Sequence, residues 1–235
     1  MNEAKSNLNL NKAANTNRTM IKNDIDGFSL IELLIVLVIS SISISLIIFY
    51  LSGFKKVYKP DEQTAKVGDF MQEARQRSLT QRETVRVEIN LDKGIVRLID
   101  ENGDSANDGN DDDVVLKQTI LLSPTEVAYN KRPDDISVNP PEPIPVYPFV
   151  FYQSDYPGSE LDKVVTLRFK RNGSVTDKND VLLSGTLYLW SPNKDNPNKS
   201  DIARSITVLG GSGIVRFWEW NVNSTDSNKW KDSRR

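Results

Sequence analysis

The sequence contains neither cysteine nor histidine among its 235 residues. These absences exclude disulfide bonds, thiol nucleophiles, histidine bases and zinc sites built from cysteine and histidine. The sequence also lacks a large net charge, because it contains 30 Lys and Arg and 32 Asp and Glu. This balance argues against a surface that binds nucleic acid generally, but it leaves room for a local basic patch. The length fits one or two domains.

One long hydrophobic run is present, from Phe28 to Leu51, and Glu32 is its single ionisable residue. A helix of this length measures about 36 Å, enough to cross a hydrocarbon layer of about 30 Å. Serines within the run can bond to helix carbonyls. Lysines flank the run on both sides, so the distribution of positive charge does not fix its orientation.

Glu32 is the residue that a simple membrane anchor does not explain. An unpaired carboxylate near the centre of a bilayer costs about 3 kcal/mol. So close to the start of the run, it could extend to the lipid headgroups, or it could have a partner of opposite charge. A secretory signal peptide does not fit, because Gly27 precedes the apolar run and no small-residue cleavage site follows it. An uncleaved single-pass anchor is the plain alternative.

The segment from Gly27 to Glu32 reads Gly-Phe-Ser-Leu-Ile-Glu and leads into the apolar run. It resembles the class III signal of type IV prepilins and of the pseudopilins of type II secretion. The resemblance implies that a prepilin peptidase removes residues 1–27 on the cytoplasmic side and methylates the new amino group of Phe28. It also implies that Glu32 neutralises the terminal ammonium of a neighbouring subunit, so that two charges costly in lipid form an ion pair.

This resemblance also supplies partners and a location. The expected partners are the prepilin peptidase, other pilins or pseudopilins that pack through the N-terminal helix, and an inner-membrane assembly platform. The expected location is the bacterial inner membrane, crossed once, with the C-terminal head in the periplasm and the processed chain in a filament.

We expect a transmembrane helix over residues 28–52 and its soluble continuation over residues 53–83. Apolar residues recur at helical spacing in the second part, at Val67, Phe70, Met71 and Ala74, and this stripe should pack on a sheet. Pro60 should kink or break the helix.

The remainder predicts a β-rich head over residues 84–222 and a flexible tail over residues 223–235. Alternation around Val85–Ile89 and a turn at Asp92-Lys93-Gly94 indicate a hairpin. A helix followed by a run of strands predicts an α+β fold, with the long N-terminal helix packed on an antiparallel sheet, as in pilins. Further strands are expected from Val114, Tyr147, Lys163, Gly185, Ala203 and Gly213.

The order of these segments is similar to that of the GspH/FimT family of minor pseudopilins and minor pilins. The similarity rests on "EARQRSLTQRETVRVEI" from Glu73, on "LIDENGD" and "VVLKQ" in the following hairpin, on "LRFKRNGSV" and on "GSGIVRF". It covers most of the chain after residue 27.

An acidic segment, "DENGDSANDGNDDD", starts at Asp100. Asp100, Asn102 and Asp104 match the start of a calcium-binding loop, in which alternating oxygens converge on the cation. Ser105 stands where that loop needs glycine, and Asp111 stands where it needs glutamate. A solvated acidic hairpin tip is the alternative, and it is the one we expect, with no cofactor.

The C-terminal segment "RFWEWNVNSTDSNKWKDSRR" combines basic and aromatic residues, which can bind single-stranded nucleic acid. Some FimT-like minor pilins bind DNA through a Gly-Arg-x-Arg motif, but here Ile214 replaces the first arginine between Gly213 and Arg216. We therefore expect a last strand and no DNA binding. The proline-rich stretch over residues 139–148 should be an extended, stiff loop that could dock a partner.

We expect a minor pseudopilin of a type II secretion system, assembled at the tip or initiation complex of the pseudopilus. The alternative is a FimT-like minor pilin of a type IV pilus, serving pilus assembly, adhesion or DNA uptake. A membrane-anchored periplasmic enzyme is disfavoured, because Ser212 has neither the spacing of a nucleophile elbow nor a histidine to activate it.

Overall fold

The computed structural model describes residues 28–101, 113–154, 156 and 158–233, with side chains except those of residues 49–57. The predicted leader and most of the acidic segment lie outside these residues. The chain divides into two units, one ending at Ile48 and one starting at Phe49, and each is described by itself. The second unit contains the head.

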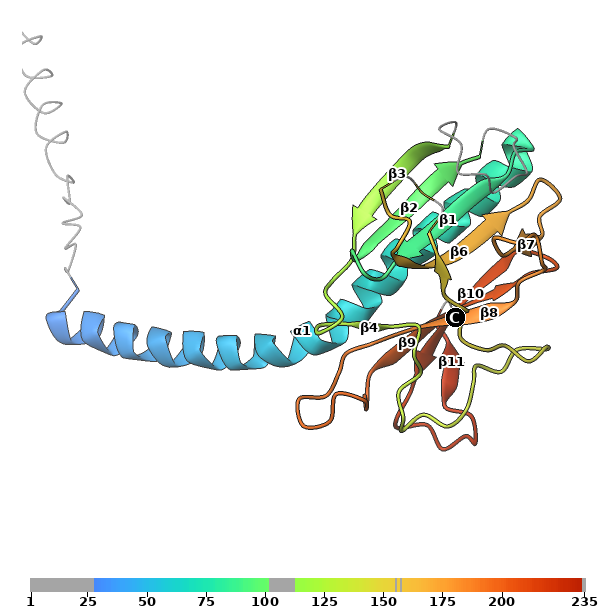
Figure 1. Cartoon of the computed structure of the whole chain (residues 1–235). Coiled ribbons are helices and arrows are strands. Elements are labelled where there is room, and N and C mark those ends of the chain that lie inside the picture. Colours follow the sequence, from blue (N-terminus) through green and yellow to red (C-terminus); the bar gives the residue numbers. More distant parts are fainter. Residues whose placement is uncertain (1–27, 102–112, 155, 157, 234–235) are drawn as a thin grey trace, which may run out of the picture. The chain divides into compact units, whose positions relative to one another are not determined.

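A single helix, α1, extends over Leu30–Gln81 (Figure 1). It begins after Ser29, whose carbonyl accepts the first helical hydrogen bond, from the Leu33 amide at 3.1 Å. It ends at Arg82, whose φ of 59° is the left-handed conformation that usually terminates helices at glycine. The predicted long helix is therefore present, with its end close to the expected residue.

Of the two outcomes predicted at Pro60, the break is wrong, because α1 continues through this residue, and the kink stays a prediction. A proline inside a helix removes one hydrogen bond and costs about 3 kcal/mol. Contacts to the head on either side of the proline offset part of this cost. Lys59 pairs with Glu126 at 2.7 Å, and Asp61 forms an ion pair with Arg204.

Gln63, one turn later, fixes the same part of the helix. It is fully buried, and its side-chain oxygen accepts hydrogen bonds from the Leu122 amide at 3.0 Å and from the Tyr129 hydroxyl at 3.2 Å. The Thr64 hydroxyl also donates to the Pro60 carbonyl at 2.7 Å. Tertiary contacts therefore hold a helical conformation that the local sequence disfavours.

The first antiparallel sheet has the strand order β3-β2-β1-β6-β5, with β7 paired to β6. Its strands are β1 (Val85–Asn90), β2 (Ile95–Asp100), β3 (Val114–Ile120), β5 (Tyr152–Gln153), β6 (Lys163–Phe169) and β7 (Val175–Thr176). Val87 pairs with Leu98 on one side and with Leu167 on the other. These three residues lie on the face that packs toward the helix.

The second antiparallel sheet has the strand order β11-β10-β9-β8-β4. Its strands are β4 (Ala128–Tyr129), β8 (Gly185–Trp190), β9 (Ala203–Leu209), β10 (Ile214–Trp220) and β11 (Trp230–Asp232). In the strand predicted from Tyr147, Tyr152–Gln153 pairs as β5, and Pro148 forms an isolated parallel bridge with Thr186.

The predicted loose tail is also wrong for the described residues, because the chain returns to the sheet as β11. Trp230 drives this return. Its side chain is 2% exposed and packs against Trp220 and Tyr188, with ring centroids 5.4 and 5.9 Å apart. Its indole NH donates to the Val138 carbonyl at 3.0 Å, so burial leaves no unsatisfied donor.

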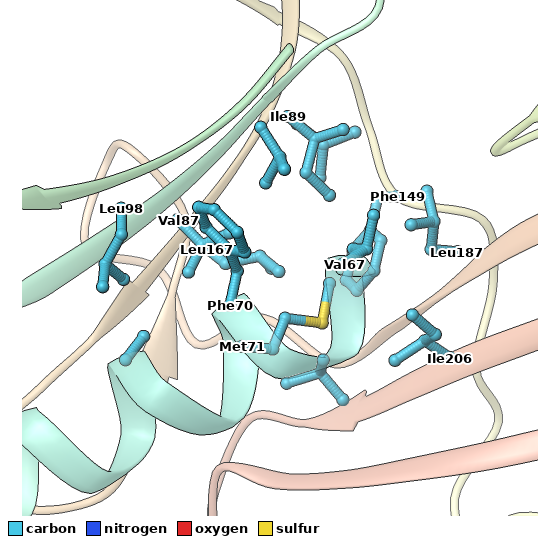
Figure 2. Packing of buried hydrophobic residues seen from close by; sticks show 14 of the residues in the cluster. Val67, Phe70, Met71, Val87, Ile89, Leu98, Phe149, Leu167, Leu187 and Ile206 are labelled. Carbon is cyan, nitrogen blue, oxygen red and sulfur yellow. The ribbon is translucent and has the colours of Figure 1, made fainter. Parts of the chain in front are cut away.

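The core of the head lies where α1 meets the inner faces of both sheets (Figure 2). The predicted stripe of Val67, Phe70, Met71 and Ala74 is buried there, with exposed fractions of 3% or less. Figure 2 shows Met71 directed between residues of the first sheet and Ile206 and Leu187 of the second. The prediction that this stripe packs on a sheet is confirmed, and so is the α+β class.

Candidate functional site

The first unit presents an apolar helical surface that is not buried among the residues that the structure describes. Residues Leu30–Ile48 have a mean hydropathy of 2.7, and none of this span is buried within the structure. At about 1.5 Å per residue the span measures about 28 Å, close to the thickness of a bilayer interior. By length and composition, this helix can cross a membrane.

Three of the four serines of this span satisfy their hydroxyl groups within the helix. The hydroxyls of Ser41, Ser43 and Ser45 donate to backbone carbonyls three or four residues earlier, at 2.8 to 2.9 Å. A hydroxyl bonded in this way is tolerated in lipid. Glu32 is therefore the one residue of the span that carries a charge.

Glu32 lies in the first turn of α1. The amides of a helix N-terminus carry partial positive charge, which favours a carboxylate at this position. Phe28, four residues earlier, is 78% exposed. Within the part of the chain that the structure describes, the Glu32 side chain has no hydrogen bond or ion pair. The predicted cleavage residue Gly27 lies outside the described residues.

The chemistry that this arrangement allows is an ion pair. If a peptidase cuts before Phe28, a new ammonium group appears at the entry to the apolar helix. A carboxylate at Glu32 is then the complementary charge on an identical or similar helix. Glu32 thus offers one half of an ion pair, which such an ammonium would complete.

The acidic segment offers less to a metal ion. Asp100 ends β2, whereas Asn102 and Asp104 lie outside the described residues, so neither the expected solvated tip nor the calcium alternative is tested. Among the residues that the structure describes, no three Asp or Glu side chains converge as metal ligands. Asp113, at the far end of the segment, instead pairs with Arg86.

A buried charged cluster that the sequence pattern did not reveal joins the strands of the first sheet. Arg168 is fully buried and donates to both oxygens of Glu101, through Nε at 2.8 to 2.9 Å and Nη2 at 2.5 Å. Its Nη1 reaches Asp180 at 2.9 Å. Burial raises the pKa of Glu101, and the hydrogen bonds from Arg168 oppose this effect. The cluster stabilises the outer face of the sheet.

In the described part of the basic and aromatic C-terminal segment, residues 216–233, two of the three tryptophans are almost fully buried. Arg216 donates to Glu142 at 2.8 Å, and the indole NH of Trp218 donates to the same carboxylate at 2.9 Å. Trp218 and Trp230 are 8% and 2% exposed. The strand expected here is present as β10, but it is followed by β11 and is not the last. Trp218 and Trp220 join a small core on the outer face of the second sheet, whereas Phe217 belongs to the main core.

Comparison with known families finds one motif match, which lies within the first unit. The prokaryotic N-terminal methylation motif matches residues 22–48, which include Gly27, Phe28, Glu32 and the apolar span. Neither a curated protein nor a solved structure matches the chain. The motif implies processing by a prepilin peptidase and assembly with other pilins. The matched motif, the apolar helix and the antiparallel β head together support a type IV pilin-like protein with a prepilin-type signal.

Proposed function

We propose that the chain is a minor pseudopilin of a type II secretion system. A prepilin peptidase removes residues 1–27, the apolar helix holds the chain in the inner membrane, and the head faces the periplasm. The processed chain then joins the tip or initiation complex of the pseudopilus. This role is mechanical and needs no cofactor and no catalytic activity.

The observation that carries the proposal is the position of Glu32 within the matched motif. Its carboxylate lies in the first turn of an exposed apolar helix, without a partner among the described residues. A lone carboxylate in lipid costs about 3 kcal/mol, and an ammonium at Phe28 carries a similar cost. Docking two processed helices in register lets each charge neutralise the other, so assembly relieves a cost that each free subunit carries.

The ion pair of Arg216 favours a role in secretion over that of a DNA-binding minor pilin. Phosphate binding requires a basic side chain that is free to exchange its partner for an anion. Arg216 instead pairs with the carboxylate of Glu142, whose side chain is fully buried. The FimT-like alternative, with a role in pilus assembly, adhesion or DNA uptake, remains the second candidate because it uses the same N-terminal motif.

An in-frame deletion in the native host separates these two functions. Secreted proteins are quantified by mass spectrometry, and surface pili and DNA uptake are measured in the same cultures. The proposal predicts that secretion falls and that wild-type complementation restores it while pili persist. Loss of pili or DNA uptake with normal secretion would favour the minor pilin instead.

Complementation with Glu32→Gln tests the role of the carboxylate. This change keeps the size of the side chain and removes its charge, so processing should continue while assembly and secretion fail. Ser41→Ala is the matched control, because the Ser41 hydroxyl bonds only within its own helix. Full complementation by Glu32→Gln, with normal processing, would contradict the ion-pair mechanism.

A further inference from the structure

A hollow of the head lies between two segments of the long connection from β4 to β5. One segment contributes Lys131, Arg132 and Asp134, and the other contributes Tyr147 and Pro148. The volume of the hollow is about 690 Å³, within the range of about 300–1,000 Å³ that is usual for small-molecule sites. We call this feature the Arg132 hollow.

Asn130 holds the two segments side by side. Its side-chain amide donates to the Phe149 carbonyl at 2.7 Å, and its side-chain oxygen accepts from the Phe149 amide at 3.1 Å. Asn130 also has a φ of 63°, a left-handed conformation that asparagine adopts more readily than most residues. A fixed framework therefore brings the two sides of the hollow together.

The guanidinium group of Arg132 is oriented by neutral partners. Its Nη1 donates to the side-chain oxygen of Asn139 at 2.7 Å, and the Tyr188 hydroxyl donates to the same oxygen at 2.9 Å. The Asn139 side chain in turn donates to the Val146 carbonyl at 3.0 Å. Among the residues that the structure describes, no carboxylate forms an ion pair with Arg132. This half-buried cation therefore has a fixed position and no counter-ion.

Six other arginines of the second unit are neutralised by Asp or Glu: Arg77, Arg86, Arg97, Arg168, Arg204 and Arg216. A charge that is partly removed from water without such a partner is costly. A ligand carboxylate would supply the missing charge and could accept two parallel hydrogen bonds from a guanidinium group. Lys131 adds a second positive charge, because its ion pair with Asp134 is exposed and, at 3.4 Å, long. The hollow therefore favours an anion.

The charges of the hollow also limit what kind of anion it accepts. Lys131 and Arg132 contribute two positive charges, and Asp134 contributes one negative charge. A nucleic acid carries a phosphate on every nucleotide and would bring further negative charge beside Asp134. A ligand with a single carboxylate and several hydroxyl groups fits better, because the Asp134 carboxylate can accept hydrogen bonds from hydroxyls.

Tyr147 adds a flat apolar surface to the same hollow. The Thr186 amide donates to the Tyr147 carbonyl at 2.8 Å, so the backbone is fixed, but the Tyr147 side chain does not join the core and the residue is 66% exposed. A sugar ring has one face of C–H groups that packs on an aromatic ring, and its hydroxyl groups point outward from its edge. An aromatic ring beside a few charged groups is the composition of a small-molecule site.

We propose that the Arg132 hollow binds a sugar unit that carries a carboxylate, such as a hexuronate of an acidic polysaccharide. Arg132 and Lys131 bind the carboxylate, Asp134 accepts hydrogen bonds from hydroxyl groups, and Tyr147 packs against the ring. This binding goes beyond the assembly role of the N-terminal helix, because it gives the head a ligand of its own. It does not depend on Glu32 or on which machine the chain joins.

Isothermal titration calorimetry of the full-length chain, in a detergent without a sugar headgroup, tests this proposal. Trigalacturonate is the probe, and the neutral galactose trisaccharide is its matched control because it lacks only the carboxylates. Triglutamate and a short single-stranded oligonucleotide present negative charge on a peptide and on a nucleic acid. We expect trigalacturonate to bind at least about tenfold more tightly than each of the other three.

Two variants of the hollow locate the binding. Arg132→Gln and Tyr147→Ser should each weaken the binding of trigalacturonate at least about tenfold. Arg171→Gln and Val181→Ser are their matched controls, because both residues are exposed and lie outside the hollow, and these variants should bind normally. Tryptophan fluorescence of each variant verifies that the head is folded.

Four results would each overturn the proposal. They are no binding of trigalacturonate, equal affinity for the neutral trisaccharide, equal affinity for triglutamate or the oligonucleotide, and unchanged affinity in Arg132→Gln or Tyr147→Ser.

Discussion

Gly213 holds the turn between β9 and β10 in a conformation that other residues rarely adopt. Its φ is 59°, and its amide donates to the Leu209 carbonyl at 2.7 Å. A Cβ atom at this position would lie 2.4 Å from the carbonyl oxygen of Gly173. Gly211, two residues earlier, would place its Cβ in open space. The two glycines therefore form a matched pair for substitution by alanine.

The expected cost of Gly213→Ala has two parts. The left-handed conformation costs an L-residue about 1–2 kcal/mol. Because the nearest obstacle is backbone, relief of the contact with Gly173 requires a shift of the turn, and overpacking of this kind costs about 1–3 kcal/mol. The sum of about 2–5 kcal/mol is a large part of a typical unfolding free energy of about 5–15 kcal/mol. Gly211→Ala should be neutral, or more stable by up to about 1 kcal/mol.

Urea unfolding of the full-length chain in detergent measures both variants. All four tryptophans lie in the head, at positions 190, 218, 220 and 230, so their fluorescence reports on that unit alone. Gly213→Asn should fall between the wild type and Gly213→Ala, because asparagine accepts the left-handed conformation but keeps the steric conflict. Equal stability of Gly213→Ala and Gly211→Ala would refute the reasoning.

Three further predictions use the same unfolding assay. Met71→Ala should lower the unfolding free energy by about 2–5 kcal/mol, because Met71 is fully buried. The control Gln76→Ala should change it by less than about 0.5 kcal/mol, because Gln76 is exposed. Equal effects of the two substitutions would contradict the described core. The hydrogen bond from Lys117 lowers the pKa of Glu73, so this carboxylate contributes stability above its unfolded pKa of about 4.5 and loses it as the pH falls through the folded value. Lys117→Met should therefore lose less stability than the wild type on acidification, and an identical acid dependence would count against this pair. Arg82→Gly should raise the unfolding free energy by up to about 1 kcal/mol, because glycine adopts a φ of 59° without strain. A loss of stability would show that the contacts of the Arg82 side chain contribute more to the unfolding free energy than the relief of backbone strain.

Features that depend on local pattern could be predicted from the sequence. The spacing of Val67, Phe70 and Met71 identified the buried face of α1, because a helix places such residues on one side. The turn at Asp92-Lys93-Gly94 identified the hairpin of β1 and β2, and Gly94 has the expected positive φ of 61°. Both signals lie within a few residues of the structure that they specify.

Features that depend on contacts distant in sequence could not be predicted. Pro60 stays helical because Lys59 and Asp61 bind residues far along the chain, and no local rule contains those contacts. Trp230 returns to the sheet because its ring packs against Trp220 and its indole NH donates to the Val138 carbonyl. The polar residues that precede Trp230 led to the prediction of a flexible tail.

The same difference between local patterns and distant contacts applies to the candidate site. The segment containing Phe28 and Glu32 is a short local motif, and the family comparison matched the same residues. The burial of Glu142 against Arg216 required the fold, because those residues are on different elements and neither has a distinctive neighbour. The sequence predicted a strand for the segment that contains Arg216, but it did not reveal the carboxylate with which Arg216 pairs.

The most direct test of the account is the N-terminus of the chain recovered from membranes of its native host. Mass spectrometry of the intact protein and of its N-terminal peptide identifies the first residue and any added methyl group. The account predicts that the chain starts at Phe28, with a methylated amino group. A chain that keeps residues 1–27, or that starts anywhere else, would contradict it, because Glu32 would then lack the terminal ammonium that its proposed role requires.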